Sequence, residues 1–321
     1  MNINERRDLI IRNSVEVLNK EEIDEVLKRK KLRVYCGYEP SGEVHLGHLV
    51  TMMKLLDFQK ADIDVTVLLA NWHAWLNKKG DWNFLEKQMK LWENGMKAAG
   101  LKSANFVKGT DFQRKEDYIN DVMLMALETT VNRGVRSMQM VARDIENAKI
   151  SQIIYPLMQI EDIKALDLDF VVAGIDQRKI HALGLELFSK IGLTKKPVFV
   201  HTGIITSLKG PGEKMSSSIP ASMISIRDSK SSIKEKIGKA YCPEGNAEQN
   251  PILEICKLIL FPKFGGIKVE RSKKFGGELS YKSYDDLESD FVGKKLHPLD
   301  LKKSVSEYLE EIIEPIRKAW K

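Results

Sequence analysis

The stretch that most constrains the fold runs from Leu32 to Leu56. Residues 32–37 mix β-branched and aromatic side chains and are followed by a short run with Pro, Ser and Gly, a pattern typical of a buried strand that ends in a loop. From Val44 onward the apolar residues recur at helical spacing. A strand, a tight loop and a helix are therefore expected, and the unpaired N–H groups at the start of such a helix suit a phosphate.

Two histidines and a glycine lie in the first turns of this helix. His45 and His48 are about one helical turn apart, and Gly47 between them allows close backbone approach. Imidazoles so placed could hydrogen-bond phosphate oxygens as negative charge builds on them. Alone, the pattern is short, and a pair of histidines on a helix is more often structural.

A second candidate phosphate-binding element lies far downstream, in the run Lys214-Met215-Ser216-Ser217-Ser218. A lysine in a loop rich in Gly and Pro can place its ammonium on a polyphosphate, and serines supply hydroxyl and N–H donors. Alone, this run would be read as a solvated surface loop. In this order and at this separation, the two elements resemble the ATP-handling motifs of the class I aminoacyl-tRNA synthetases.

Composition limits the alternatives. The chain is 43% hydrophobic and 30% charged, as expected for a globular protein, and its net charge of +6 is compatible with an RNA partner without establishing one. No stretch reads as a signal peptide or a membrane span, so we expect a cytoplasmic protein with no membrane partner. Three scattered cysteines predict neither a disulfide framework nor a zinc site, and no metal site on the protein is expected.

Five buried strands are expected, at residues 32–37, 64–70, 104–108, 169–173 and 198–201. Helical patterns separate them, which predicts an α/β fold: a Rossmann-like, doubly wound parallel sheet with its site at the carboxyl ends of the strands. Before the first strand, residues 4–31 read as amphipathic helices with Ser14 and Asn19 as caps. Because proline is tolerated in a first helical turn, Pro156 predicts that the helix around it begins near Tyr155.

The chain is expected to have two domains. Residues 1–228 would form the catalytic domain, with a helical insertion at about 115–150 that either covers the sheet or meets another subunit. Beyond Arg227 strand-like runs almost vanish and charged helical segments take over. Residues 229–321 are therefore expected to form a smaller, mostly α-helical domain.

Three polar residues, Tyr155, Gln159 and Asp162, share one face of an otherwise apolar helix. Such residues either satisfy one another or line a pocket. With this face in view, the chain resembles the tyrosyl-tRNA synthetases of the archaeal and eukaryotic type over nearly its whole length. Ile219-Pro220 departs from that family, which usually has a Lys-Gly pair after the serines.

The resemblance implies a role for each matching position. Tyr35 and Asp162 match residues that bind the phenolic hydroxyl of tyrosine, and a site built around a hydroxyl rejects phenylalanine because its own polar groups would be left unpaired. The other amino-acid positions are Ala70 and His73 as pocket walls and Tyr155, Gln159 and Gln177 around the α-amino group and the ring. His73 could equally be a buried structural histidine.

The remaining implied positions concern ATP and RNA. The ATP-binding positions are Gly37, His45, His48, Asp176, Lys214, Met215, Ser216 and Ser217, of which His45, His48, Lys214 and Ser217 are implied to be catalytic. The acceptor stem of the tRNA would be contacted by Arg136, Arg178 and Lys179, and the anticodon by Phe275, His297 and Asp300. Mg²⁺ is expected with ATP, and a homodimer is expected.

The function implied is that of a tyrosine–tRNA ligase, which activates L-tyrosine with ATP to give tyrosyl-AMP and pyrophosphate and then transfers tyrosine to the 3′ end of tRNA(Tyr). A carboxylate is already a competent nucleophile, so the first step needs positioning and charge stabilisation rather than a Ser-His-Asp triad. Three alternatives remain: a tryptophanyl enzyme, a catalytically silent RNA-binding paralogue and a nucleotidylyltransferase of the same superfamily.

Overall fold

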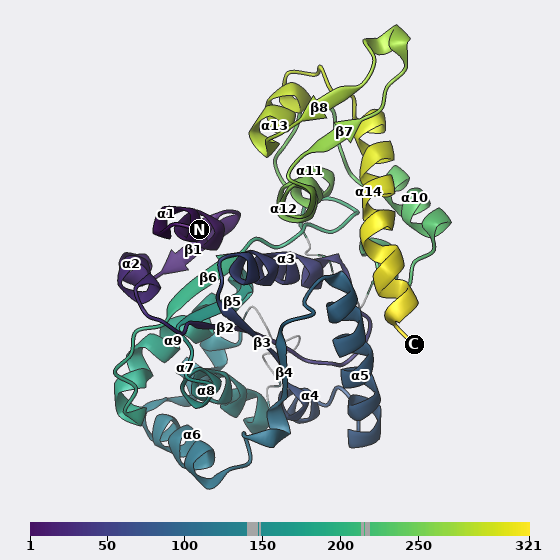
Figure 1. Ribbon diagram of the computed structural model, residues 1–321. Helices are drawn as coiled ribbons and strands as arrows, with labels where there is room; N and C mark the ends of the chain where they lie inside the picture. Colours follow the sequence, from purple (N-terminus) through teal and green to yellow (C-terminus); the bar gives the residue numbers. More distant parts are fainter. Residues whose placement is uncertain (140–146, 148, 213–214, 216–218) are drawn as a thin grey trace. The chain divides into compact units, whose positions relative to one another are not determined.

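The computed structural model describes residues 1–139, 147, 149–212, 215 and 219–321, which form two compact units (Figure 1). Unit 1 comprises Met1–Ser41, Leu55–Glu93 and Leu101–Thr202, and unit 2 comprises Gly42–Lys54, Asn94–Gly100 and Gly203–Lys321. The domain boundary near residue 228 stays a prediction. Within the described part of the chain, no helix is long and apolar enough to cross a membrane.

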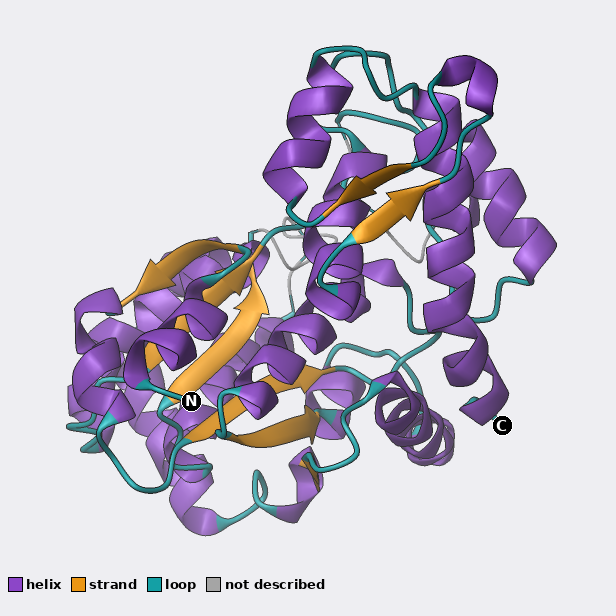
Figure 2. Cartoon of the chain, turned by 45° about the horizontal axis from the view of Figure 1, so that its top comes forward, coloured by secondary structure: helices purple, strands orange, loops and turns teal. Residues whose placement is uncertain are grey.

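Unit 1 is built on a six-stranded sheet with the order β1-β6-β5-β2-β3-β4. Figure 2 shows strands in orange. Its strands are β1 (Ser14–Leu18), β2 (Arg33–Tyr38), β3 (Asp64–Leu69), β4 (Asn105–Lys108), β5 (Phe170–Gly174) and β6 (Val198–Thr202). All neighbours are parallel except β1, which runs antiparallel to β6. The predicted doubly wound parallel sheet is confirmed, and its strand order reverses between β2 and β5, where such folds bind ligands.

Strand β1 was not predicted. The expected helical cap Ser14 is the first residue of this strand, and Asn19 follows it in the left-handed conformation without a side-chain cap bond. The segment is short and mostly half-buried, so its own pattern does not separate an edge strand from a helix. Its pairing with β6, far away in the sequence, decides the conformation.

Helices cover both faces of the sheet. In unit 1, Phe58 of α3 contacts Phe170 of β5 on one face, with ring centroids 5.3 Å apart. The next residue of β5, Val171, points to the other face and joins a core that α6, α8 and α9 complete. The helices that lie at least partly in unit 1 are α1 (Ile3–Ile11), α2 (Ile23–Leu27), α3 (Leu46–Lys60), α4 (Asn71–Leu76), α5 (Trp82–Ala99), α6 (Glu116–Glu128), α7 (Val131–Ser137), α8 (Ile150–Ala165) and α9 (Arg178–Leu187).

The helix that carries Asp162 begins earlier than predicted. Helix α8 starts at Ile150, so Pro156 lies inside it rather than in its first turn. Proline there leaves one backbone acceptor of the preceding turn without its N–H donor. Buried side chains on both sides of Pro156 hold the helix together, and tertiary packing overrides the local signal. In the insertion, α6 and α7 confirm the helical prediction, whereas residues 140–146 and 148 lie outside the described residues.

Unit 2 is mostly helical, as predicted. Its own helices are α10 (Lys230–Lys239), α11 (Pro251–Ile255), α12 (Phe261–Phe264), α13 (Tyr284–Val292) and α14 (Pro298–Ala319), with a π-helix at Cys256–Leu260. A two-stranded antiparallel ribbon of β7 (Ile267–Val269) and β8 (Leu279–Tyr281) was not predicted. Each of its strands has only three residues, too few for a period-two pattern to show.

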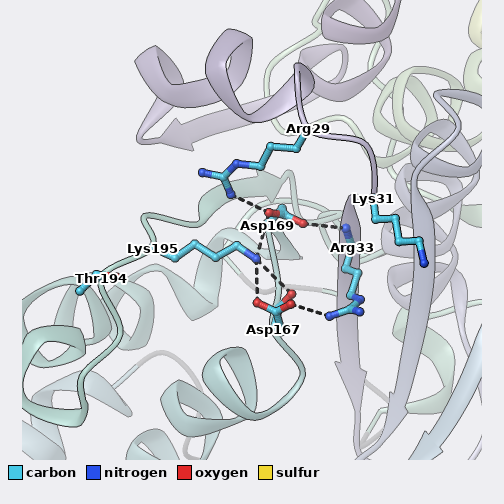
Figure 3. Close-up of a pocket in the computed structure, with 7 residues that line it drawn as sticks. All are labelled: Arg29, Lys31, Arg33, Asp167, Asp169, Thr194 and Lys195. Atoms are coloured by element: carbon cyan, nitrogen blue, oxygen red, sulfur yellow. Dashed lines mark hydrogen bonds and ion pairs between the residues drawn. The ribbon is translucent and has the colours of Figure 1, made fainter.

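The amino edge of the main sheet carries an ion-pair cluster that stabilises unit 1 (Figure 3). Asp169, before β5, is buried and accepts hydrogen bonds from the Arg33 N–H and the Arg29 guanidinium, both at 2.9 Å. Lys195 Nζ lies 2.9 Å from Asp169 and 3.0 Å from Asp167. Because these charges pair with one another, the cluster fixes the start of two central strands.

A second buried carboxylate, Glu161 of α8, is next to Asp162 in sequence but has different partners. Glu161 is 3% exposed, and its hydrogen bond is to Asp121, which also pairs with Lys164. Burial, followed by the charge of Asp121, raises the pKa of Glu161 from 4.5 to about 8. Glu161 is therefore protonated near neutral pH and donates to Asp121.

Replacing Glu161 with glutamine is expected to stabilise the protein at alkaline pH. Because the pKa is raised in the folded state, the stabilising contribution of the protonated group is present below about pH 4.5 and is lost as the pH rises through about 8. Glutamine keeps an N–H donor for Asp121 and never ionises. The thermal midpoint of Glu161→Gln should match the wild type at pH 5 and exceed it by about 3 °C or more at pH 8.5.

The matched control is Glu21→Gln, which neutralises an exposed glutamate of the same unit. In Glu21→Gln, the change in thermal midpoint between pH 5 and pH 8.5 should equal that of the wild type. A Glu161→Gln midpoint that follows the wild type at both pH values would contradict a buried, protonated Glu161.

Candidate functional site

A group of buried polar side chains lies in unit 1 and includes the predicted readers of the phenol, Tyr35 and Asp162. Tyr35, on β2, and Asp162, on α8, are 2% and 1% exposed, and the charge of Asp162 acts on the Tyr35 hydroxyl. Burial, followed by this charge, raises the pKa of Tyr35 well above its ordinary value. The two buried side chains therefore influence each other electrostatically, and the Tyr35 hydroxyl stays protonated as a donor. Ala70, at the end of β3, is buried in the same core.

Two residues that were not predicted hold the Asp162 carboxylate. Gln113 Nε2 donates to Asp162 Oδ1 at 2.8 Å, and the Tyr118 hydroxyl donates to the same oxygen at 2.9 Å. Burial raises the pKa of Asp162 to about 7 although both hydrogen bonds lower it. The carboxylate is therefore fixed in orientation and changes its charge near neutral pH.

His73, on α4, lies beside Gln113 and Asp162, and its tautomer follows from these neighbours. Its Nδ1 lies 3.1 Å from Gln113 Nε2, which can only donate, so Nδ1 accepts. Burial lowers the pKa of His73 to about 3, so the ring is neutral and its proton is on Nε2. Nε2 lies 3.9 Å from Asp162 Oδ2, and a hydrogen bond with the Tyr155 backbone opposes the lowering of the pKa without cancelling it.

The polar face of α8 continues toward the loop after β5. The Tyr155 ring packs edge-on against His73 at 4.5 Å, and its hydroxyl is hydrogen-bonded to Glu39. Gln159 Nε2 donates to Gln177 Oε1 at 3.4 Å. The five predicted residues all lie in unit 1: Tyr35 within β2, Gln177 just after β5, and Tyr155, Gln159 and Asp162 on α8.

Three functional candidates were missed: Gln113, Tyr118 and Glu39. Gln113 and Glu39 each follow a strand at the carboxyl edge of the sheet, and this position was a signal that could have found them. Tyr118 had no such signal, because it meets Asp162 only through the packing of α6 on α8.

The two histidines of the first motif lie in unit 2, at the start of α3. Gly47 N–H donates to His45 Nδ1 at 3.1 Å, and His45 N–H donates to His48 Nδ1 at 3.2 Å. Burial lowers the pKa of His48 well below its ordinary value. Since each Nδ1 accepts, the ring proton of each histidine is on Nε2. A Cβ on Gly47 would lie 2.9 Å from the His45 ring, so a larger residue there would displace that ring.

The other predicted nucleotide residues are divided between the units. Gly37 and Asp176 lie in unit 1, at the ends of β2 and β5, whereas Met215 is buried in unit 2. Lys214, Ser216 and Ser217 lie outside the described residues. Within the ranges that the structure describes, no group of three or more His, Cys, Asp or Glu side chains is arranged to hold a metal ion.

The predicted acceptor-stem residues are exposed in unit 1. Arg178 and Lys179 begin α9, and Lys179 Nζ donates to Gln139 Oε1 at 2.6 Å, near the end of α7 that carries Arg136.

The predicted anticodon residues lie in unit 2. Phe275 ends a short 3₁₀ helix. His297 caps α14 by accepting from the Leu299 N–H at 3.2 Å, and Asp300 lies in the first turn of that helix. The structure thus gives His297 a structural role, and its contact with RNA stays a prediction.

Comparisons with known proteins identify the family of the chain. The family model of the class I tRNA synthetases (W and Y) matches residues 27–314. The tyrosine–tRNA ligase of Archaeoglobus fulgidus is 47% identical over 321 residues, covering 99% of this chain and 98% of that protein. The corresponding ligase of Methanopyrus kandleri is 46% identical over 325 residues, covering 99% and 98%.

Solved structures give the same result. The crystal structure of the Archaeoglobus fulgidus tyrosyl-tRNA synthetase complexed with L-tyrosine has a TM-score of 0.95 at 46% identity, covering 100% of both chains. The predicted resemblance is confirmed. The chain belongs to the class I tRNA synthetases and, within them, to the tyrosine–tRNA ligases.

Proposed function

We propose that this chain joins L-tyrosine to tRNA(Tyr) through a tyrosyl-AMP intermediate made from ATP. The observation that carries this proposal is the buried pair Tyr35 and Asp162, with Asp162 fixed by Gln113 and Tyr118. A phenol has one hydrogen to donate and lone pairs that accept. Tyr35 donates to the phenol oxygen, and the phenol hydroxyl donates to Asp162.

The α-amino group would be bound by the polar residues further along α8. An ammonium group offers only donors, so it needs acceptors such as the Gln159 carbonyl oxygen and the Tyr155 hydroxyl oxygen. The tyrosine carboxylate is then free to attack the α-phosphate of ATP, and pyrophosphate leaves. Positioning supplies much of the rate, because both reactants are held in line.

The two histidines of α3 would stabilise the charge that develops during this attack. Each presents a protonated Nε2, so both can donate to phosphate oxygens without carrying a charge themselves. Lys214, Ser216 and Ser217 are proposed to add a cation and hydroxyl donors. Gly37 is proposed to contact ATP, and Asp176 to accept hydrogen bonds from the ribose hydroxyls. Mg²⁺ is proposed to enter with ATP and to neutralise charge on the pyrophosphate.

The RNA would be held by Arg136, Arg178 and Lys179 near the acceptor stem and by Phe275, His297 and Asp300 at the anticodon. A homodimer is also proposed, supported by exposed apolar side chains in and after α6: Met123, Leu124, Leu127 and Val131. Light scattering at micromolar concentration would detect it. A cytoplasmic location stays a prediction.

Amino-acid-dependent pyrophosphate exchange tests the proposal. With ATP and Mg²⁺, tyrosine should support exchange, whereas tryptophan and phenylalanine should not. Charging of tRNA(Tyr) should follow. Exchange driven by tryptophan would favour the tryptophanyl alternative, and absence of exchange with every amino acid would favour the silent RNA-binding paralogue.

The affinity for tyrosine is expected to fall as the solution is acidified below pH 7. Asp162, with its pKa of about 7, accepts the phenol hydroxyl most strongly when it is ionised. Tyrosine binding therefore favours loss of the Asp162 proton. Calorimetric titration should show affinity about tenfold weaker at pH 6 than at pH 8 and level above pH 8. A flat profile, or tighter binding in acid, would contradict the assigned role of Asp162.

A further inference from the structure

Two buried histidines connect the amino-acid pocket to the edge of the sheet in unit 1. His181, on α9, and His201, on β6, are both 0% exposed, and His181 Nδ1 lies 2.8 Å from His201 Nε2. At one end, His201 Nδ1 lies 3.1 Å from Glu16 Oε2. At the other end, Gln159 Nε2 lies 3.4 Å from His181 Nε2. Glu16, His201, His181 and Gln159 therefore form a continuous hydrogen-bonded series, called here the histidine chain.

The far end of the histidine chain is a carboxylate that stays ionised. Glu16 of β1 and His201 of β6 are direct partners in the antiparallel ladder. The Arg178 Nε donates to both Glu16 oxygens, at 2.8 and 2.9 Å. Burial alone would raise the pKa of Glu16, but Arg178 and His201 lower it by more, so its net pKa is below the ordinary value. An ionised carboxylate can only accept hydrogen bonds.

The ionised Glu16 carboxylate fixes the donor and the acceptor of each hydrogen bond along the histidine chain. Since Glu16 accepts, His201 Nδ1 carries the ring proton. Burial lowers the pKa of His201 and of His181, so both rings are neutral and each has one proton. His201 Nε2 then accepts from His181 Nδ1, which leaves His181 Nε2 without a proton. His181 Nε2 can therefore only accept, and Gln159 must offer it an N–H.

The orientation of the Gln159 amide follows. One hydrogen of its Nε2 is donated to His181 and the other to Gln177 Oε1, each at 3.4 Å. Its Oε1 has no partner among the residues that the structure describes and is the group left for a ligand. An α-ammonium group needs an acceptor, whereas a reversed amide would present N–H groups to it.

We propose that Glu16, His201 and His181 are positioning residues that hold the Gln159 amide with its oxygen toward the α-ammonium group of tyrosine. This assignment rests on the proposed function, because it needs tyrosine in the pocket. None of the three residues touches the substrate. They act through Gln159, and the free energy that they contribute depends on the charge of the ligand's amino group.

The test compares tyrosine with 3-(4-hydroxyphenyl)propionate, which has the same phenol and carboxylate but no amino group. His181→Phe keeps a ring of similar size and removes the acceptor for Gln159. It should weaken tyrosine binding about tenfold and leave binding of the desamino compound unchanged, because only tyrosine carries the ammonium group. Glu16→Ala, at a partly exposed site, should weaken tyrosine binding about threefold with the same selectivity.

The matched control is Glu22→Ala. Glu22 is 30% exposed and pairs with Lys196, as Glu16 is 28% exposed and pairs with Arg178. It should change neither affinity. If the His181 variant does not fold, the Glu16 variant decides the question.

If the His181 and Glu16 variants lose affinity for tyrosine and for the desamino compound equally, the substitutions damage the site in general, and the assignment is overturned. Unchanged affinity for tyrosine in these variants would overturn it as well. A wild-type protein that supports no tyrosine-dependent pyrophosphate exchange would overturn the proposed function and, with it, this assignment.

Discussion

Asp162→Asn should reduce the preference for tyrosine over phenylalanine by about 10³-fold in kcat/KM for pyrophosphate exchange. The carboxylate is the acceptor for the phenol hydroxyl, and phenylalanine leaves it buried without that partner. Asparagine keeps the shape of the side chain but loses the charge. When its oxygen accepts from Gln113 and Tyr118, an NH2 group replaces the second oxygen and cannot accept from the phenol hydroxyl. The measurement is exchange with each amino acid at pH 8, where Asp162 is ionised.

The control for Asp162→Asn is Glu161→Gln on the same helix. It replaces a neighbouring carboxyl that is also buried, but this carboxyl is bonded to Asp121 and not to Gln113 or Tyr118. Its preference for tyrosine should equal that of the wild type. A second variant, Tyr35→Phe, removes the other phenol contact and should lower the preference by about 10²-fold. Unchanged selectivity in Asp162→Asn would place the hydroxyl of the substrate elsewhere.

His48→Ala should lower the rate of tyrosyl-AMP formation by about 10²- to 10³-fold while leaving the affinity for tyrosine unchanged. The physical reason is the loss of one Nε2–H donor to the phosphates in the transition state. Rapid mixing under single-turnover conditions measures the rate, and equilibrium titration measures the affinity. Equal losses in rate and affinity would contradict a role in charge stabilisation.

Two conservative variants separate the structural role of His48 from its chemical role. His48 Nδ1 accepts from the His45 N–H, and asparagine can replace that acceptor. Asparagine has no donor at the position of Nε2, so His48→Asn should be as slow as His48→Ala. Glutamine places an N–H near Nε2 and should restore part of the rate. His297→Ala, which also removes an imidazole that accepts a backbone N–H at a helix start, should leave tyrosyl-AMP formation unchanged.

The central part of the fold was predictable because its signals are local. The strands β2, β3, β5 and β6 are buried on both faces, so their apolar runs stand out against the helical patterns between them. Strand β1 and the start of α8 were predicted wrongly because partners distant in sequence decide both. Glu16 lies in a strand only because β6 pairs with it, and Pro156 lies inside a helix only because the core packs around it.

The site was predictable to a different extent. Tyr155, Gln159 and Asp162 lie on one face of α8, and helical periodicity alone brings them together. Their partners Gln113 and Tyr118 come from other elements, 49 and 44 residues away from Asp162, and no spacing rule connects them. The histidine chain depends on β1, because Glu16 meets His201 only when residues 14–18 form a strand beside β6.

The most direct test of the central claim is a crystal structure of this protein with L-tyrosine bound. The phenol oxygen should lie about 2.5–3.0 Å from both the Tyr35 hydroxyl and an Asp162 carboxylate oxygen. The Gln159 carbonyl oxygen should face the α-ammonium group. A phenol oxygen that contacts neither Tyr35 nor Asp162 would contradict the account.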